Sequence, residues 1–282
     1  MNTRNLSYRI IKDSGFKVLV ILLSAITIFP LLFILFYIIK NGISVINWQF
    51  LTSLPKPVGE VGGGISNALV GTLMLLAISC SVSIPFGGCA GIYLTERKEG
   101  KLSSLVRLSV EILQGIPSIV IGIIAYTWVV ISMGTFSALS GGIALGIMML
   151  PVIVRATEET LKLIPDTLKE ASLSLGVPYS RTILKVILPA GMSGIVTGIL
   201  LSVARIAGET APLLFTAFGN PFMEVNIFKP INSLPLLIFN YANSPYPEWH
   251  ALAWGASFVL VVFILILNFT TKVVTKKWKV QF

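Results

Sequence analysis

Long apolar runs alternate with short polar stretches along the whole chain. The six runs cover residues 18–39, 68–94, 105–132, 136–154, 190–218 and 252–274. A helix needs about 20 residues to cross the hydrocarbon core of a bilayer, and each run has about that length. None of the runs shows the two-residue alternation of a membrane strand, and a helix satisfies its own backbone hydrogen bonds in lipid. The pattern predicts an all-α membrane protein with six transmembrane helices.

Composition supports this prediction. Of the 282 residues, 55% are hydrophobic and 12% are charged, whereas charged residues make up about 25% of a soluble domain. The mean hydropathy of +0.88 is typical of a protein dissolved in a bilayer. The first apolar run is too long for the hydrophobic part of a signal peptide, and no small-residue cleavage site follows it. We expect it to be retained as the first span.

Positive charge is concentrated on one side of the predicted spans. Lysine and arginine gather before the first span, after the second, after the fourth and after the sixth. The segments on the other side contain only Lys40, Lys56 and Lys229. Cytoplasmic loops carry the excess of Lys and Arg in membrane proteins, so both termini are predicted to be cytoplasmic. The net charge of +9 expresses this bias and does not indicate nucleic acid as a partner.

Residues that carry enzymatic or metal chemistry are scarce. Cys80 and Cys89 fall in the second span on opposite helix faces. His250 is the only histidine and has no cysteine or aspartate near it. Lys101 is the nearest approach to a phosphate-binding loop, but Leu102 follows it in place of Ser or Thr. We therefore predict no enzyme, no cofactor and no metal, and any ATP hydrolysis would need a partner. An ion-coupled secondary transporter is less favoured, because no convincing internal repeat is found.

The segment 158–189, between the fourth and fifth spans, is amphipathic. Its apolar residues recur at helical spacing, at Leu168, Ala171 and Leu175. Gly176 and Pro178 break the pattern, and a second helix is predicted from about Tyr179. Two short helices joined by an exposed turn would form a docking element on the cytoplasmic side. A helix lying on the bilayer surface is the alternative.

The same segment resembles the EAA loop of ABC-importer permeases. Residues 170–189 read Glu-Ala-Ser, three residues, Gly, nine residues and Val-Ile-Leu-Pro, and depart from the family signature only at Ser172 and Val186. The resemblance implies that this loop lies in a groove on an ATPase subunit and couples hydrolysis to the helix bundle. The residues implied in coupling are Glu170, Ala171, Gly176, Leu188 and Pro189.

Four further stretches are similar to the PstA family of phosphate-specific permeases. They are GGI-x-NA-x-x-GT at 63–72, GIPSIV-x-G at 115–122, LP-x-x-xR-x-x-E at 150–158 and AR-x-x-GETAPLLFTA at 204–217. The resemblance covers roughly residues 60–272 and implies a permease for inorganic phosphate with the type I, MetI-like bundle of ABC importers. The related PstC-type subunit, and a permease for another oxyanion such as phosphonate or molybdate, remain alternatives.

The family also implies an assembly and a division of the chain. A PstC-like second permease, two copies of a PstB-like ATPase subunit and an extracytoplasmic PstS-like phosphate-binding protein would complete the importer in a bacterial or archaeal plasma membrane. Residues 1–64 are predicted to hold the N-terminus, the first span and an outer loop. Residues 65–274 would form the permease core, and residues 275–282 a cytoplasmic tail.

Arg205 and Glu209 interrupt the fifth apolar run. A charge within a membrane is costly and needs a partner or a polar cavity. On one continuous helix the two residues share a face and can pair, before Pro212 bends or ends the helix. The fork of a guanidinium binds phosphate oxygens two at a time, and a nearby carboxylate keeps the empty site near neutrality. The residues alone allow two roles for this pair: an ion pair that locks two helices, or part of a substrate path. The resemblance favours the substrate path.

Residues 115–119 are a second candidate part of the path. Pro117 frees a backbone carbonyl in the third span, and Ser118 adds a hydroxyl. A helix that restarts here would direct N–H groups at an anion. A proline kink packed against its neighbours is the alternative. Ser118 therefore joins the charged pair of the fifth span as a predicted substrate-path residue.

Three further expectations concern packing. Glycines four residues apart predict close helix contacts, at Gly87 and Gly91, Gly142 and Gly146, and Gly194 and Gly198. Glu111 is expected to pair with Arg107, one turn before it on the same helix. Residues 233–242 are predicted to form a short helix at the outer membrane surface, where nearby aromatic residues would anchor the loop.

Overall fold

The computed structural model describes residues 3–60 and 62–277, and helices are the regular elements of this part of the chain. Its α-helices are α1 (Thr3–Gly42), α2 (Trp48–Thr52), α3 (Ser66–Glu96), α4 (Lys101–Gly115), α5 (Ser118–Ala125), α6 (Ile131–Met133), α7 (Ala138–Lys162), α8 (Asp166–Ser174), α9 (Tyr179–Thr182), α10 (Leu188–Ile206), α11 (Ala211–Leu214), α12 (Leu234–Ala242) and α13 (Pro247–Lys277). Two π-helical segments, η1 (Tyr126–Val130) and η2 (Ile183–Ile187), continue α5 and α9. The predicted all-α class is confirmed.

Five helical segments of the described residues are long and apolar enough to cross a membrane. They are Lys12–Gly42, Ser66–Glu96, Ala138–Lys162, Tyr179–Ile206 and Pro247–Val273. Lys101–Gly115 and Ser118–Met133 add a sixth span if the two are counted together. The predicted number of six is confirmed on that count, and residues 278–282 of the predicted tail lie outside the described part.

The third predicted span is not a single helix, because its two halves meet at an angle of 108°. Ile116, the residue before Pro117, has the extended conformation with φ −73° and ψ 130°. The proline ring disfavours the helical region for the preceding residue, and proline donates no backbone hydrogen bond. The chain therefore ends α4 at Gly115 and starts α5 at Ser118 in a new direction.

The fifth predicted span was wrong at both ends. Its helix begins at Tyr179, because α9, η2 and α10 follow without a break, and it ends at Ile206 instead of Phe218. Pro189 would clash with the turn before it in a regular α-helix, and the wider π-turns of η2 lie directly in front of it. Pro212 does not bend this helix, since it lies in the first turn of the separate helix α11.

Helices α3 and α7 form the centre of the bundle and pack closely. A Cβ added to Gly91 would lie 2.5 Å from the Cβ of Thr157, so only glycine permits this approach. The hydroxyls of Ser79 and Ser83 donate to the carbonyls of Gly142 and Gly146, at 3.0 and 2.7 Å. The glycine spacing therefore predicted a real contact surface, and α3 runs through the Pro85 region as one continuous helix.

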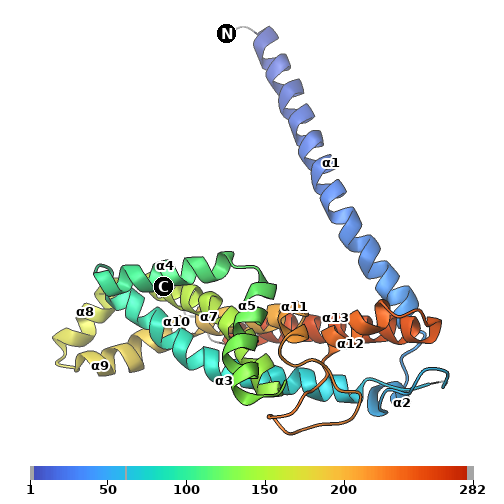
Figure 1. Ribbon diagram of the computed structural model, residues 1–282. Helices are drawn as coiled ribbons and strands as arrows, with labels where there is room; N and C mark the ends of the chain where they lie inside the picture. The colour runs from blue at the N-terminus through green and yellow to red at the C-terminus, as the bar shows by residue number, and fades with distance from the viewer. Residues whose placement is uncertain (1–2, 61, 278–282) are drawn as a thin grey trace.

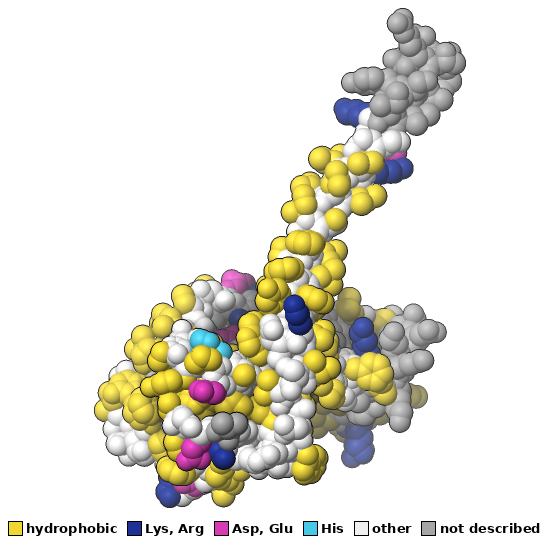
Figure 2. All heavy atoms as spheres, turned by 90° about the vertical axis from the view of Figure 1, so that its right-hand side faces the viewer, with side chains coloured by type: hydrophobic (Ala, Val, Ile, Leu, Met, Phe, Trp, Pro, Cys, Tyr) yellow, Lys and Arg dark blue, Asp and Glu magenta, His cyan; other side chains and the backbone are white. Residues whose placement is uncertain are grey.

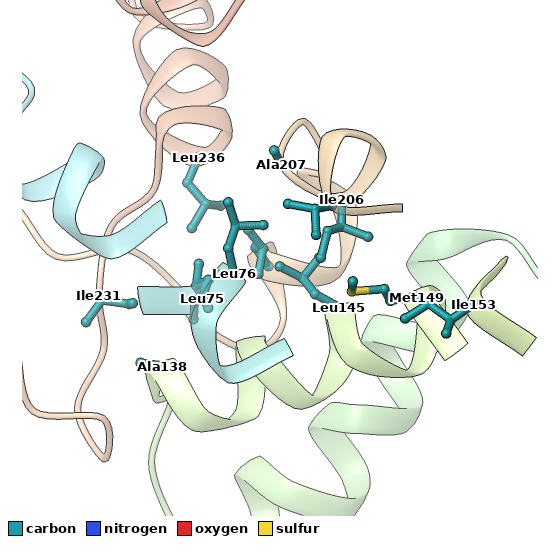
Figure 3. Close-up of a cluster of buried hydrophobic side chains, with 13 residues drawn as sticks. Leu75, Leu76, Ala138, Leu145, Met149, Ile153, Ile206, Ala207, Ile231 and Leu236 are labelled. Carbon is teal, nitrogen blue, oxygen red and sulfur yellow. The ribbon is translucent and has the colours of Figure 1, made fainter. Parts of the chain in front are cut away.

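The largest apolar core lies where α3, α7, α10 and α12 meet (Figure 3). Leu75, Leu145, Met149, Ile206 and Leu236 are nearly or completely buried in it. Helix α12 confirms the predicted short helix over residues 233–242, which Ser233 caps at its N-terminus. It packs one face into the core and against α13, instead of lying free on a surface.

Helix α1 projects away from the rest of the molecule (Figure 1). It touches α13 near its own C-terminal end, where the rings of Tyr37 and Trp254 lie 6.4 Å apart. Exposed hydrophobic side chains cover its middle part, and charged side chains lie toward its ends (Figure 2). Helices α8 and α9 lie at one end of the bundle, and α2 and the foot of α1 lie at the other (Figure 1). The predicted coupling segment and the foot of α1 therefore lie at opposite ends of the bundle.

Candidate functional site

Arg205 and Glu209 lie at the end of α10, where the helix gives way to a turn. Arg205 is in the last helical turn, and Glu209 lies beyond the last helical residue, Ile206. The Glu209 amide donates to the Ile206 carbonyl at 3.1 Å, so the turn keeps both side chains on one side. The prediction that the two residues can pair is confirmed, although they do not share one helix.

The pair is loose. The Arg205 Nε lies 3.9 Å from the Glu209 Oε1, and their side chains are 57% and 21% exposed. Among the described residues, the one charged partner of the Arg205 guanidinium is Glu209, at this long distance. A structural ion pair is normally shorter and often doubly hydrogen-bonded. The guanidinium therefore retains donors for another partner.

A cavity of about 210 Å³ brings the two predicted parts of the path together. Residues of α4, α5, α7 and the end of α10 line it. Its polar and proline lining residues are Gln114, Pro117, Ser118, Pro151, Arg205 and Glu209. Ser118 and Arg205 are far apart in the sequence, and their common cavity exists only because α5 turns back at Pro117.

Helix α5 is held beside this cavity by close backbone contact. A Cβ added to Gly122 would lie 2.6 Å from the Cα of Pro212, so α5 and α11 touch directly. The contact fixes the start of α5, with its Ser118 hydroxyl, at the edge of the cavity. The first turn of a helix has N–H groups without partners inside the helix, and these favour an anion.

A buried carboxylate, which the sequence analysis missed, organises charge on α7. Glu158 is fully buried and pairs with Arg107 at 3.0 Å, with Lys162 at 2.6 Å and with Arg155 at 3.7 Å. The predicted pair of Arg107 with Glu111 is wrong, because Glu111 pairs with Arg155 at 2.6 Å. The reason is that Arg107 and Glu111 both face α7, so each pairs with a residue of α7 instead of with the other. The Arg-x-x-Glu spacing at 155–158 was the available signal.

The predicted coupling segment is present as two helices, α8 and α9–η2, with an exposed turn between them. Gly176 in this turn has φ +77°, and an added Cβ would meet no atom within 4 Å. Glu170 and Ala171 are exposed on α8, and the Ser172 and Thr182 hydroxyls join the two helices at 2.9 Å. Leu175 beside the turn is 84% exposed. The segment therefore presents exposed apolar side chains at the end of the bundle together with charges of both signs, such as Glu170 and Arg181.

Of the two other predicted coupling residues, Pro189 is exposed and Leu188 is half-buried at the start of α10. They lie at the base of the segment rather than on its tip, because α9, η2 and α10 form one helical run. The five predicted coupling residues are thus divided between the exposed helix α8 with its turn and the root of the fifth span.

Residues 83–280 match the family model described as binding-protein-dependent transport system inner membrane component. The match covers more than half of the chain. The chain belongs to this family. It is a multi-pass membrane permease.

Curated relatives share much of the permease's length. The phosphate transport system permease protein PstA of Yersinia pestis is 42% identical over 253 residues, which are 89% of this chain and 86% of that protein. The probable phosphate transport system permease protein PstA of Methanocaldococcus jannaschii is 36% identical over 260 residues, 92% of each chain. The permease therefore belongs to the PstA group.

Solved structures agree on the fold. A chain of the MetNI methionine ABC transporter in an inward-facing conformation superposes with a TM-score of 0.64 at 19% identity, over 77% of this permease and 98% of that chain. A chain of an amino acid ABC transporter with histidines gives a TM-score of 0.57 at 14% identity, over 76% and 93% of the two chains. The permease therefore has the MetI-like fold.

Proposed function

We propose that this chain is the PstA-type permease subunit of an ATP-driven importer for inorganic phosphate. The observation that carries the proposal is the cavity in which Arg205, Glu209 and Ser118 meet. The names of the PstA relatives support phosphate as the transported anion. In this role the chain forms half of the translocation path.

The three residues have complementary roles toward phosphate. Arg205 presents a planar fork that binds two phosphate oxygens at once, as an ammonium does not. Ser118 donates its hydroxyl to a further oxygen. Glu209 is mostly shielded and accepts only, so it bonds to the O–H that phosphate keeps near neutral pH. It also offsets the charge of Arg205 and so prevents the anion from binding too tightly to leave.

Partners complete the path and supply the energy. The cavity is open, and more than half of the Arg205 side chain is exposed, which suits a site closed by a PstC-like second permease. The 282-residue sequence has no phosphate-binding loop for ATP. Two PstB-like ATPase subunits would dock on the segment 158–189, and a PstS-like binding protein would deliver phosphate at the opposite end. Both termini would then be cytoplasmic, as the charge bias indicates.

Uptake of radiolabelled phosphate by the reconstituted four-component complex tests the proposal. We expect uptake that depends on ATP and on the binding protein, and that excess phosphate suppresses. Phosphonate and molybdate serve as competitors. Stronger competition by either of them than by phosphate would reassign the substrate, and uptake without the ATPase would contradict the importer mechanism.

A further inference from the structure

Three polar side chains from separate elements meet where α3 ends. Glu96 is the last residue of α3, and its carboxylate accepts from the Lys169 ammonium of α8 and from the Tyr179 hydroxyl of α9. The Lys169 Nζ also lies 3.3 Å from the Tyr179 hydroxyl and 4.8 Å from the centre of its ring. The Glu96 and Lys169 side chains are only 15% and 26% exposed. We call Glu96, Lys169 and Tyr179 the α3 anchor.

The ammonium of Lys169 in the α3 anchor remains protonated under ordinary conditions. Burial favours the neutral form of Lys169, but its hydrogen bonds to Glu96 and Tyr179 outweigh burial and raise its pKa above the ordinary value of 10.5. The Lys169 ammonium therefore stays protonated and keeps donating to Glu96 and Tyr179.

The α3 anchor is the more shielded of the two ion-paired contacts between α8 and the region where α3 ends. Helix α8 also makes an apolar contact, where Leu168 packs against the cluster that contains Ile164 and Ile183. Among the described residues, no backbone hydrogen bond joins α8 to α3. The position of α8 relative to α3 is therefore set by side chains alone.

Helix α3 leads from the anchor toward the cavity through its contact with α7. Gly91 and Gly87 lie against Thr157 and Ile153 without room for a Cβ. Further toward the N-terminus of α7, Pro151 and Met148 line the cavity. Closely packed helices shift as rigid bodies rather than deform, so a displacement of the end of α3 reaches the lining of the cavity.

We infer that Glu96 is a positioning residue. It fixes residues 166–182 of the coupling segment to α3, so that movement of these residues is passed to the helices around the cavity. This inference rests on the proposed function for its transport consequence. Its structural part, the attachment of the segment to α3, stands on the contacts of the anchor.

A second ion pair provides a matched control. Lys98 and Asp166 join the same two segments at 3.7 Å, but their side chains are 67% and 78% exposed. Exposed pairs of this kind contribute little, because water screens them and long side chains must be ordered. Lys98 lies outside the docking segment 158–189, so Lys98→Gln removes one charge of this exposed pair without changing the surface that meets the ATPase.

The test measures attachment and transport separately in the purified complex. Glu96→Gln keeps the size of the side chain and removes its charge. We expect amide hydrogen exchange in residues 166–182 to become about tenfold faster, and the phosphate transported per ATP hydrolysed to fall several-fold, while the ATPase still copurifies. Lys98→Gln should leave both quantities unchanged. The charge-exchanged double variant, Glu96→Lys with Lys169→Glu, should restore both.

Unchanged exchange in Glu96→Gln, or faster exchange with an unchanged transport ratio, would overturn the inference. If the single variant does not assemble, the double variant decides: recovery supports the anchor, and no recovery refutes it. A wrong proposed function would appear differently, as absent phosphate uptake by the unmutated complex, while hydrogen exchange would still report whether Glu96 attaches the segment.

Discussion

At the scale of the residue, the ending of α10 decides what Arg205 can do. A longer helix would have placed Arg205 and Glu209 directly one above the other, as a close pair. Because α10 ends at Ile206, the two groups are 3.9 Å apart and the guanidinium faces a cavity. This geometry favours a substrate path over a locked ion pair.

Substitution of the pair separates these two roles. Arg205→Lys keeps the charge and loses the fork, so we expect a marked fall in phosphate uptake. Uptake by Arg205→Gln should fall at least as far, and this variant leaves Glu209 without its partner. In the double variant, Arg205→Gln with Glu209→Gln, the lone charge is gone, so assembly should be normal while uptake stays absent. Copurification and uptake are measured in the same cells, and full uptake in the double variant would refute the substrate role.

At the scale of the element, the contact between α3 and α7 depends on individual glycines. Gly91 has no room for a side chain, whereas Gly88 on the same helix has no atom within 4 Å of an added Cβ. Gly91 is therefore packed against α7 and Gly88 is not, although both lie in the same helix, so Gly88 serves as a matched control.

Replacement of each glycine by alanine measures how much this contact contributes to the stability of the permease. We expect Gly91→Ala to destabilise the permease by roughly 1–3 kcal/mol through overpacking, seen as a lower thermal midpoint in detergent. Gly88→Ala should leave the midpoint unchanged or raise it, because alanine favours a helix more than glycine does. Equal midpoints for the two variants would mean that α3 and α7 do not pack as closely as described.

The turn between α8 and α9 is a second element with a testable role. Gly176 has φ +77°, and Gly134, in the turn after α6, has a similar φ of +71° with open space around it. Aspartate at either position meets the same backbone strain. The two sites differ in surroundings, since only Gly176 lies in the proposed docking surface.

We expect Gly176→Asp to reduce phosphate uptake strongly while the protein still inserts into the membrane, because the added charge and side chain occupy the surface that meets the ATPase. Gly134→Asp should affect ATPase copurification little. Copurification and uptake are measured for both variants. Normal values of both for Gly176→Asp would remove the docking role from this turn.

At the scale of the whole molecule, one chain exposes far more apolar surface than a monomer keeps in water. Exposed apolar side chains cover most of the middle of α1, from Val18 to Ile39 (Figure 2). The cavity at Arg205 is open to the outside of the subunit. Lipid and partner subunits are needed to cover these surfaces.

The subunit composition of the purified complex is therefore a prediction at this scale. We expect one copy of this chain, one PstC-like permease and two ATPase subunits, because the path of a single chain is open on one side. Native mass spectrometry gives the composition. A complex with two copies of this chain and no second permease would contradict the heterodimer.

The sequence by itself determined the helical class, the number of spans, the two short helices of the predicted coupling segment and the family. These depend on local properties: the length of an apolar run, the spacing of glycines, and the residue types of a loop. A disturbance of the helix at Pro117 was also predicted, as a restarted helix or a kink, because proline restricts its own backbone and that of the residue before it.

Only the tertiary structure decided where α10 ends, which partners the charged residues take, and which segments share a cavity. Arg107 pairs with Glu158, 51 positions away, instead of with Glu111 on its own helix. Ser118 meets Arg205 because α5 turns by more than a right angle at Pro117. The physical reason is that a long side chain reaches whichever helix lies beside it, and the offset between packed helices depends on the shape of the whole bundle rather than on any single run of residues.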